Sequence, residues 1–406
     1  MNVNDLELKY KTLKSKNYKI DISRGKPSKE QLDLSNDMLT VLDKNFVFDS
    51  DDDPRNYGKL DGLDSCKRLF SQISGLSENN FIVYGNSSLN LQYELISDAF
   101  IKGIFGCTPW HKLRGVKWIC LVPGYDRHFS ICEYFGIKMI PVELKSDGPD
   151  MDTIEELIKD PLVKGIWCTP IYSNPLGITF SNNIVRRFAS LKPAARDFRV
   201  FWDLAYCVHH LSKNRDNLLN VYDEARKVSN EDLFYIFFST SKITYAGSGV
   251  AAVACSERNK TDILNKLKYK TICSDKVNQL RHVLFLKDSS QISKHMEKHS
   301  SIIAPKFKRF LDRLKSINSI CKIVEPKGGY FISVFVKNGT AKKVIERCKK
   351  CGLVLTEAGC GYPYHNDPND SHIRIAPTFL NMHEIDAAAE ILSTAIELEY
   401  YLSEEK

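Results

Sequence analysis

The sequence predicts an α/β protein in which a mainly parallel sheet lies between helices and is followed by a smaller α+β domain. Short apolar runs alternate with helix-like segments from residue 81 to residue 255, and this alternation is typical of parallel strands covered on both faces. After about residue 276 the pattern changes to a long charged helical stretch and then short strands. The length of 406 residues favours about two domains.

The strands of the large sheet are expected where β-branched and aromatic residues form short runs. These runs occupy residues 117–122, 137–144, 163–170, 198–203, 234–239 and 249–255. Residues 151–160 have the pattern of a helix, and we expect Asp152 to cap its N-terminus, with Glu155 in the first turn.

The smaller domain has a different pattern. Its strands are expected at residues 330–336, 353–356 and 372–376. A last helix is expected from about Met382, where apolar residues recur at helical spacing. The parallel pattern begins late, so we expect the first 45 residues to pack with this domain. The sequence therefore predicts a large domain at residues 46–285 and a small domain formed by residues 1–45 and 286–406.

Composition argues against several classes of protein. The net charge of +7 is spread over a long chain and does not imply nucleic-acid binding. No apolar stretch approaches the ~20 residues of a membrane span, and the N-terminus lacks the apolar core of a signal peptide. Cys348 and Cys351 form a CxxC motif, but a zinc site needs two more ligands and only Cys360 is near. We expect a cytoplasmic protein with no metal and no membrane partner.

Chemistry is first suggested by Lys242, which follows an apolar strand and the hydroxyl residues Ser239 and Ser241. A buried ammonium is costly unless it is paired or deprotonated, and a neutral lysine amine can bond covalently to an aldehyde. The two serines could donate hydrogen bonds to a phosphate. Taken alone, this motif also fits an ordinary lysine in a loop.

Asp203 ends another apolar strand, and Tyr206 follows three residues later. A carboxylate at the carboxyl edge of a parallel strand points into the crevice where α/β folds bind ligands. There it could keep a pyridine nitrogen protonated, while Tyr206 could contact a ring oxygen. Asp203 could instead cap a helix.

Three further motifs fit the same ligand. Asn174 follows a strand in an Asn-Pro turn, so its amide could touch a ring oxygen, although a plain turn explains it equally. Asn86, Ser87 and Ser88 lead into a helix whose first N–H groups form an anion site, or an ordinary cap. Arg374 lies among apolar residues of a strand, and its planar guanidinium suits a substrate carboxylate.

Taken together, these motifs resemble the fold-type I, pyridoxal-phosphate-dependent class I/II aminotransferases. The chain is most similar to the subgroup called type Ic aspartate aminotransferases, also labelled alanine–glyoxylate aminotransferase-like. The resemblance implies a mainly parallel seven-stranded sheet, pyridoxal 5'-phosphate as cofactor, and a homodimer. It covers nearly the whole chain and is carried by strings such as SRGKPSKEQLDLSN (23–36), RNYGKLDGL (55–63), GNSSLN (85–90), PGYDRHF (123–129), STSKITYAG (239–247), PKGGYFIS (326–333) and RIAPT (374–378).

The resemblance also implies a role for each matching residue. Lys242 would carry the cofactor, and Asp203 would pair with its pyridine nitrogen. Tyr125 would stack on the ring, and Tyr57 would reach the phosphate bound by the neighbouring subunit. The ring oxygen would contact Tyr206 and Asn174. The phosphate would be held by Asn86, Ser87, Ser88, Ser239 and Ser241. The substrate carboxylate would bind Arg374, with Gly25 and Asn174 beside it.

Two departures from the family pattern stand out. Most relatives place an arginine shortly after the lysine, whereas this chain reads ITYAGSGVAA there, so helix dipole, hydroxyls or another cation must meet the phosphate charge. The usual Asn-Pro-Thr-Gly reads Asn-Pro-Leu-Gly.

The resemblance implies ping-pong transamination between an amino acid, first of all aspartate, and a 2-oxo acid such as 2-oxoglutarate. A dicarboxylate needs a second cation, and the sequence does not rank the candidates Arg24, Arg127 and Arg281. A C–S β-lyase on the same scaffold and an alanine–glyoxylate transamination remain open alternatives.

Overall fold

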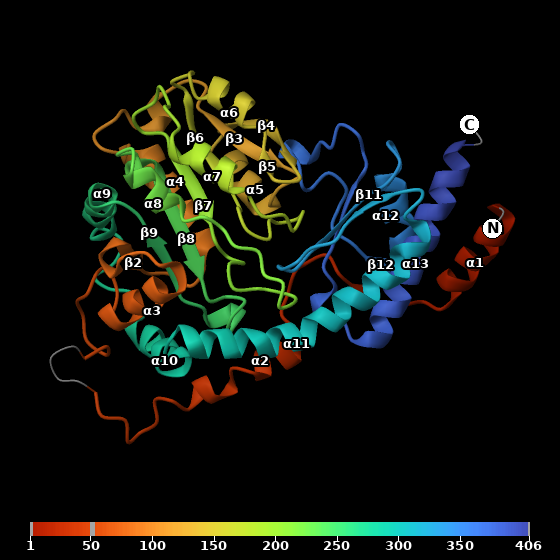
Figure 1. The fold of residues 1–406 in the computed structure, drawn as a ribbon, viewed down its shortest axis with the longest axis horizontal. Coiled ribbons are helices and arrows are strands. Elements are labelled where there is room, and N and C mark those ends of the chain that lie inside the picture. The colour runs from red at the N-terminus through yellow and green to blue at the C-terminus, as the bar shows by residue number, and fades with distance from the viewer. Residues whose placement is uncertain (1–2, 49–52, 405–406) are drawn as a thin grey trace.

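The computed structural model describes residues 3–48 and 53–404 and contains a large sheet flanked by helices (Figure 1). Within the described residues its eight strands lie in the order β2-β9-β8-β7-β6-β3-β4-β5. Their bounds are β2 (Phe81–Val83), β3 (Lys117–Val122), β4 (Lys138–Lys145), β5 (Gly148–Pro149), β6 (Val163–Cys168), β7 (Arg199–Asp203), β8 (Phe234–Ser239) and β9 (Ala251–Ala254). The strands from β8 to β4 are parallel, whereas β9 runs antiparallel to β8 and β2. The expected seven strands are joined by the two-residue β5, antiparallel to β4.

Two apolar clusters hold the sheet between its helices. Successive side chains of a strand point to opposite faces, so Phe81 joins one cluster and Ile82 the other. The first face is covered by α3 (Asp64–Ser74), α6 (Met151–Leu157), α7 (Asn182–Ala189) and α8 (Val221–Arg226). The second face is covered by α4 (Ser88–Lys102), α5 (Asp126–Tyr134) and α9 (Glu257–Leu267).

The cap of helix α6 differs from the expectation. Asp150, not Asp152, is the N-cap residue, and its side chain accepts a hydrogen bond from the N–H of Thr153. Asp152 lies inside the first turn and pairs with Arg187 of α7. Both aspartates suit a helix start, and the sequence pattern selected the wrong one because Met151 is already helical.

The smaller part of the chain has its own apolar cluster, formed mainly after residue 306 and by Leu13, Ile20 and Ile22. Its sheet pairs β11 (Ile332–Phe335) with β10 (Lys322–Val324) and with β13 (His372–Ile375), both antiparallel. A second, parallel pair joins β1 (Ile20–Asp21) to β12 (Leu353–Val354). The surrounding helices are α1 (Val3–Ser15), α2 (Lys29–Asp33), α12 (Ala341–Lys350) and α13 (Met382–Glu404).

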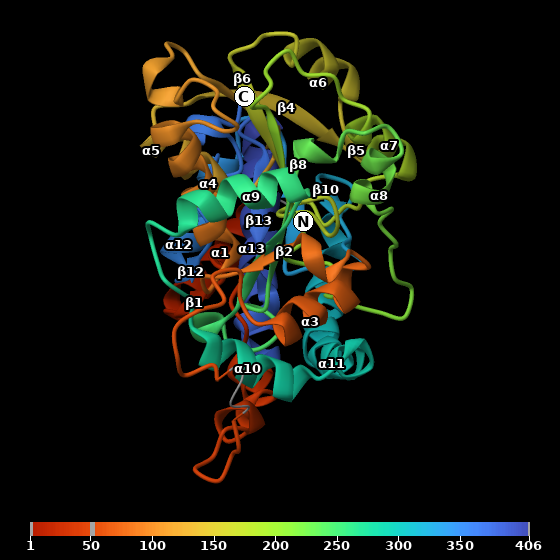
Figure 2. The same ribbon diagram turned by 90° about the vertical axis from the view of Figure 1, so that its left-hand side faces the viewer.

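Two further helices follow the large sheet along the chain. α10 (Lys276–Leu286) lies below α9 (Figure 2), and α11 (Ser289–Leu314) runs from beside α10 to the small sheet (Figure 1). The N-terminal segment after α2 extends below the body of the molecule (Figure 2). None of the helices in residues 3–48 and 53–404 combines the length and the apolar character needed to cross a membrane.

Candidate active site

The predicted cofactor residues other than Asn86 and Tyr57 meet at the carboxyl edge of the parallel strands. β3, β6, β7 and β8 all end at this edge, because parallel strands point the same way. The edge contains a cavity of about 240 Å³. Its lining is Ser87, Ser88, Leu89, Tyr125, Thr169, Asn174, Asp203, Ala205, Tyr206, Ser239, Ser241, Lys242 and Ala246. A larger groove of about 1150 Å³ beside α11 contains none of the predicted cofactor residues.

Lys242 follows β8, and its ammonium lies 4.9 Å from the centre of the Tyr206 ring. The backbone around it is held by two histidines. Nε2 of His209 lies 3.2 Å from the carbonyl oxygen of Lys242, and Nε2 of His295 lies 2.7 Å from that of Ile243. A carbonyl oxygen only accepts, so both rings donate. Burial lowers the pKa of His209 to about 3, so this ring is neutral at physiological pH.

Asp203 ends β7 and is buried. Its Oδ2 accepts a 2.9 Å hydrogen bond from Gln92 of α4, and its Oδ1 accepts one of 3.1 Å from the N–H of Ala205. His128 of α5 stands behind this pair, with Nε2 2.9 Å from Oε1 of Gln92 and 3.8 Å from Oδ2 of Asp203. The carboxylate is thereby fixed in rotation and in position.

Sequence reasoning missed Gln92 and His128. His128 lies within the quoted string at residues 123–129, and Gln92 follows the one at residues 85–90. A signal was present for Gln92, which shares a helix with the buried residues Leu91, Leu95 and Ile96. A polar side chain on an apolar helix face needs a buried partner. The partner itself comes from another element, so the sequence could not name it.

Tyr125 and Tyr206 are placed to present phenols to the cavity. Tyr125 is the N-cap residue of α5 and contacts His128 edge to face, with ring centres 4.9 Å apart. Burial raises the pKa of Tyr125 and of Tyr206 above the ordinary value, so both phenols keep their protons at neutral pH. Each can therefore donate a hydrogen bond to an oxygen in the cavity.

Asn174 lies in the loop after β6 and is buried. Its Oδ1 has no hydrogen-bond partner within residues 3–48 and 53–404. A buried polar atom left without a partner costs free energy. Here the atom belongs to a side chain that lines the cavity, so a ligand with a hydrogen-bond donor can satisfy it.

One end of the cavity is built for an anion. Oγ of Ser239 lies 2.6 Å from Oγ of Ser241, which donates to the backbone oxygen of Asn86 at 3.3 Å. Ser87 is the N-cap of the 15-residue helix α4, and Ser88 is its first residue. Helix N–H groups and hydroxyls bind phosphate without a formal positive charge.

The missing arginine is not replaced by another cation in the cavity. Lys242 is the one cationic side chain in the lining formed by the described residues. Gly249, seven residues after Lys242, packs closely, and a Cβ there would lie 2.7 Å from the backbone oxygen of Asn86. The compact serine arrangement depends on this glycine.

Arg374 lies outside the lining but next to it. It is buried in β13, its guanidinium lies 5.1 Å from the centre of the Phe331 ring, and its Nη1 donates to Asp126 at 3.1 Å. Asp126 directly follows Tyr125. Gly25 packs on the same ring, since a Cβ at that glycine would lie 2.7 Å from Phe331. Arg374 and Gly25 are thus brought together beside the cavity.

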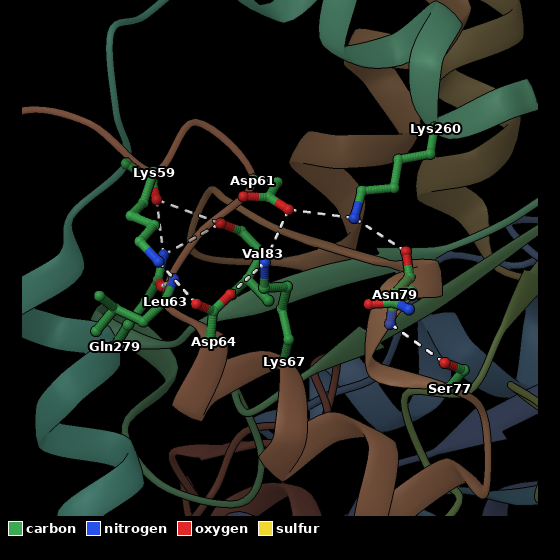
Figure 3. A network of polar contacts seen from close by, with 11 residues as sticks. Lys59, Asp61, Leu63, Asp64, Lys67, Ser77, Asn79, Val83, Lys260 and Gln279 are labelled. Atoms are coloured by element: carbon green, nitrogen blue, oxygen red, sulfur yellow. Dashed lines mark hydrogen bonds and ion pairs between the residues drawn. The ribbon is translucent and has the colours of Figure 1, made fainter. Parts of the chain in front are cut away.

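Tyr57 is not brought to this cavity, because its side chain is 76% exposed. Ion pairs and hydrogen bonds hold the segment that follows it in place (Figure 3). Asp61 accepts hydrogen bonds from Lys67 of α3, at 2.8 Å, and pairs with Lys260 of α9, at 3.1 Å. Hydrogen bonds from Lys59 and Lys67 lower the pKa of Asp64 to about 2. Tyr57 therefore extends outward from a firmly anchored base.

The residues present fit pyridoxal 5'-phosphate. A cavity lined by an anion site, a buried carboxylate and a lysine amine offers partners for the phosphate, ring nitrogen and aldehyde of that molecule. The orphaned oxygen of Asn174 and the two phenols offer contacts to the ring substituents.

Comparisons with known proteins show the family of the chain. The family model of aspartate amino-transferases matches residues 2–405. An aspartate aminotransferase of Corynebacterium glutamicum is 40% identical over 397 residues, which cover 97% of this chain and 92% of that protein. A crystal structure of an aspartate transaminase from Corynebacterium glutamicum has a TM-score of 0.96 and 39% identity, covering 99% of this chain and 96% of that one.

More distant structures share the fold alone. An α-aminoadipate aminotransferase from Thermus thermophilus has a TM-score of 0.77 at 17% identity, covering 94% of this chain and 93% of that chain. The fold is therefore that of the fold-type I transferases, as the resemblance implied. With a family match over almost its entire length, the chain belongs to the aspartate amino-transferase family and is an aminotransferase.

Proposed function

We propose that this enzyme holds pyridoxal 5'-phosphate on Lys242 and moves an amino group from aspartate, or a related amino acid, to a 2-oxo acid such as 2-oxoglutarate. The observation that carries the proposal is that Lys242 and Asp203 line one small cavity with an anion site at its end. The cofactor, when bound, supplies an electron sink for charge that develops at the substrate Cα.

The residues of the chain have separate tasks in this proposal. Asp203, held by Gln92, would pair with the pyridine nitrogen, and Asn174 and Tyr206 would contact the ring oxygen. Tyr125 would stack on the ring. The phosphate is assigned to Asn86, Ser87, Ser88, Ser239 and Ser241.

Lys242 moves the proton. Its side chain lies beside Tyr206 on the cavity wall, where its amine can take the Cα proton of a bound amino acid. Arg374 and Gly25, with Asn174 nearby, hold the substrate carboxylate and so orient the Cα–H bond toward that amine. Amino acid and 2-oxo acid bind in turn to the same place, as a ping-pong order requires.

We also propose the large and small domains at the boundaries expected from sequence, with residues 46–285 forming the cofactor domain. The separate apolar clusters support this division. The exposed side chain and anchored base of Tyr57 support a homodimer in which Tyr57 reaches the neighbouring site. Burial of cysteine thiols such as Cys66, Cys120 and Cys168 supports a cytoplasmic location.

The test is a panel of amino donors assayed with 2-oxoglutarate, using purified wild-type protein and the Lys242→Ala variant. We expect aspartate to be a substrate, and we expect the variant to lose about 10²–10⁴-fold or more in turnover, the usual contribution of a general base. Lys294→Ala, which removes an exposed lysine of α11, is the matched control. Release of pyruvate from cystathionine without transamination would identify a C–S β-lyase instead. Wild-type turnover in the Lys242 variant would refute the assignment.

A further inference from the structure

Asp126 is a carboxylate located where a substrate carboxylate is expected. Its Oδ1 accepts a hydrogen bond from Nη1 of Arg374 at 3.1 Å, and its Oδ2 accepts one from Nη1 of Arg24 at 3.3 Å. The Arg374 side chain is 3% exposed, Asp126 14% and Arg24 46%. One acidic side chain therefore bridges a buried and an accessible guanidinium.

The three residues come from different parts of the fold. Arg374 lies in β13 of the small sheet, Asp126 begins α5 beside the cavity residue Tyr125, and Arg24 belongs to the segment between β1 and α2. Among the three arginines that sequence reasoning left unranked, Arg24 is the one that shares a carboxylate with Arg374. Arg281 donates to the backbone oxygen of Met38 instead, and Arg127 is exposed on α5.

The charges of this cluster do not cancel. Two guanidinium groups face one carboxylate, so these three side chains together carry a net charge of +1 and can attract one more carboxylate. The remaining N–H groups of Arg374 support this count, since within residues 3–48 and 53–404 its Nε and Nη2 donate only to the hydroxyl of Thr356, at 3.4 and 3.3 Å. These are long contacts that a charged ligand can replace.

We propose that Asp126 is a specificity-determining residue, which competes with substrate carboxylates for Arg374 and keeps Arg24 from binding a second one. The proposal rests on the substrate-carboxylate role of Arg374 in the proposed function. A monocarboxylate needs only Arg374. When it displaces Asp126 from Arg374, Asp126 can remain paired with Arg24. A dicarboxylate gains from both arginines only if Asp126 releases both. Specificity is a difference between affinities, and an internal competitor sets that difference.

The test uses two ligands that do not react, the dicarboxylate succinate and the monocarboxylate propionate, titrated into the purified holoenzyme in a calorimeter. In Asp126→Asn, which keeps the shape and removes the charge, the dissociation constant of succinate should fall by about tenfold more than that of propionate. Adding Arg24→Gln to this variant should abolish the extra gain. Asp126→Glu should keep wild-type selectivity.

Two controls make the result decisive. Asp312→Asn removes another carboxylate that bridges two cations, Lys308 and Lys315, on the surface of α11, and should leave both affinities unchanged. Arg24→Gln alone changes only the exposed end of the cluster. It should weaken the binding of succinate and of propionate to a similar degree. Equal effects of Asp126→Asn on both ligands, or weaker binding of both, would overturn the proposal. Unchanged propionate binding in Arg374→Gln would instead refute the carboxylate role in the proposed function.

Discussion

Nε2 of Gln92 donates a 2.9 Å hydrogen bond to Oδ2 of Asp203, while Oε1 of the same amide lies 2.9 Å from Nε2 of His128. The amide oxygen only accepts, so His128 carries its proton on Nε2. One side chain of α4 thus links the carboxylate at the end of β7 to a histidine of α5, and the three residues act as a unit.

The first prediction concerns this link. Gln92→Leu removes the amide at similar size, and we expect cofactor affinity to fall about tenfold or more, because a hydrogen bond to a charged group contributes about 1.5–3 kcal/mol. Titration of the apo-protein with pyridoxal 5'-phosphate, followed by absorbance, measures the change. Gln291→Leu, on the exposed face of α11, is the control and should bind as wild type does. An unchanged affinity in Gln92→Leu would mean that Asp203 needs no partner.

A pair of glycines tests the anion site. A Cβ at Gly249 would lie 2.7 Å from the backbone oxygen of Asn86 and 3.0 Å from Oγ of Ser241, whereas a Cβ at Gly247 would meet nothing within 4 Å. We therefore expect Gly249→Ala to weaken binding of the cofactor and of inorganic phosphate, and Gly247→Ala to change neither. Calorimetric titration with each ligand measures both variants. If the two alanine variants bind these ligands with equal affinity, the phosphate does not bind at this end of the cavity.

The stability of the fold should depend on pH through buried histidines. Burial lowers the pKa of His209 to about 3, and those of His282 and His299 to about 4. In the unfolded chain these rings take up protons near pH 6.5, well before they do so in the folded protein. Their full contribution to the free energy of unfolding is therefore present above about pH 6.5. It is lost as the pH falls toward 4, by up to about 1.4 kcal/mol per pH unit for each ring.

Urea unfolding between about pH 7 and about pH 5 measures this dependence. His282→Gln keeps a polar side chain beside Thr244, whose hydroxyl lies 2.9 Å from Nε2 of His282, and removes one titrating group. The variant should be less stable at neutral pH but should lose less stability on acidification. A stability that does not change with pH in the wild-type protein would contradict the prediction.

The role of Tyr57 across a dimer can be tested by mixing two inactive proteins. Tyr57→Ala and Lys242→Ala should each lower activity. In a mixed dimer the two substitutions meet in one site and leave the other site intact, so activity should reappear after subunit exchange. Mixing Lys242→Ala with Asp203→Ala is the control: each site of that mixed dimer carries one altered residue and none is intact, so it should stay inactive. Failure of the first mixture to recover activity would place Tyr57 in its own subunit's site.

The sequence predicted the strands well because their apolar runs must be buried whatever surrounds them. Lys242, Asp203 and Asn174 could be found for the same reason, since each polar residue ends such a run or lies in the loop that follows it. Gln92 and Asp126 could not, because their importance arises from partners on other elements.

The sequence also could not choose between two nearby aspartates that both suit a helix start. The N-cap of α6 is Asp150 and not Asp152. His209, whose ring holds the Lys242 backbone, could not be singled out either. Its position beside the lysine is a property of the folded chain.

Helix α1 packs beside α13 in the smaller part of the molecule, and Lys9 pairs with Glu390 (Figure 1). β1 likewise takes its only strand partner, within the described residues, from β12. Segments from the beginning of the chain thus find their neighbours more than three hundred residues later. During synthesis on the ribosome the first helix must wait for nearly the whole polypeptide to emerge, so the small domain should be the last to fold and the one most dependent on protection from aggregation until then.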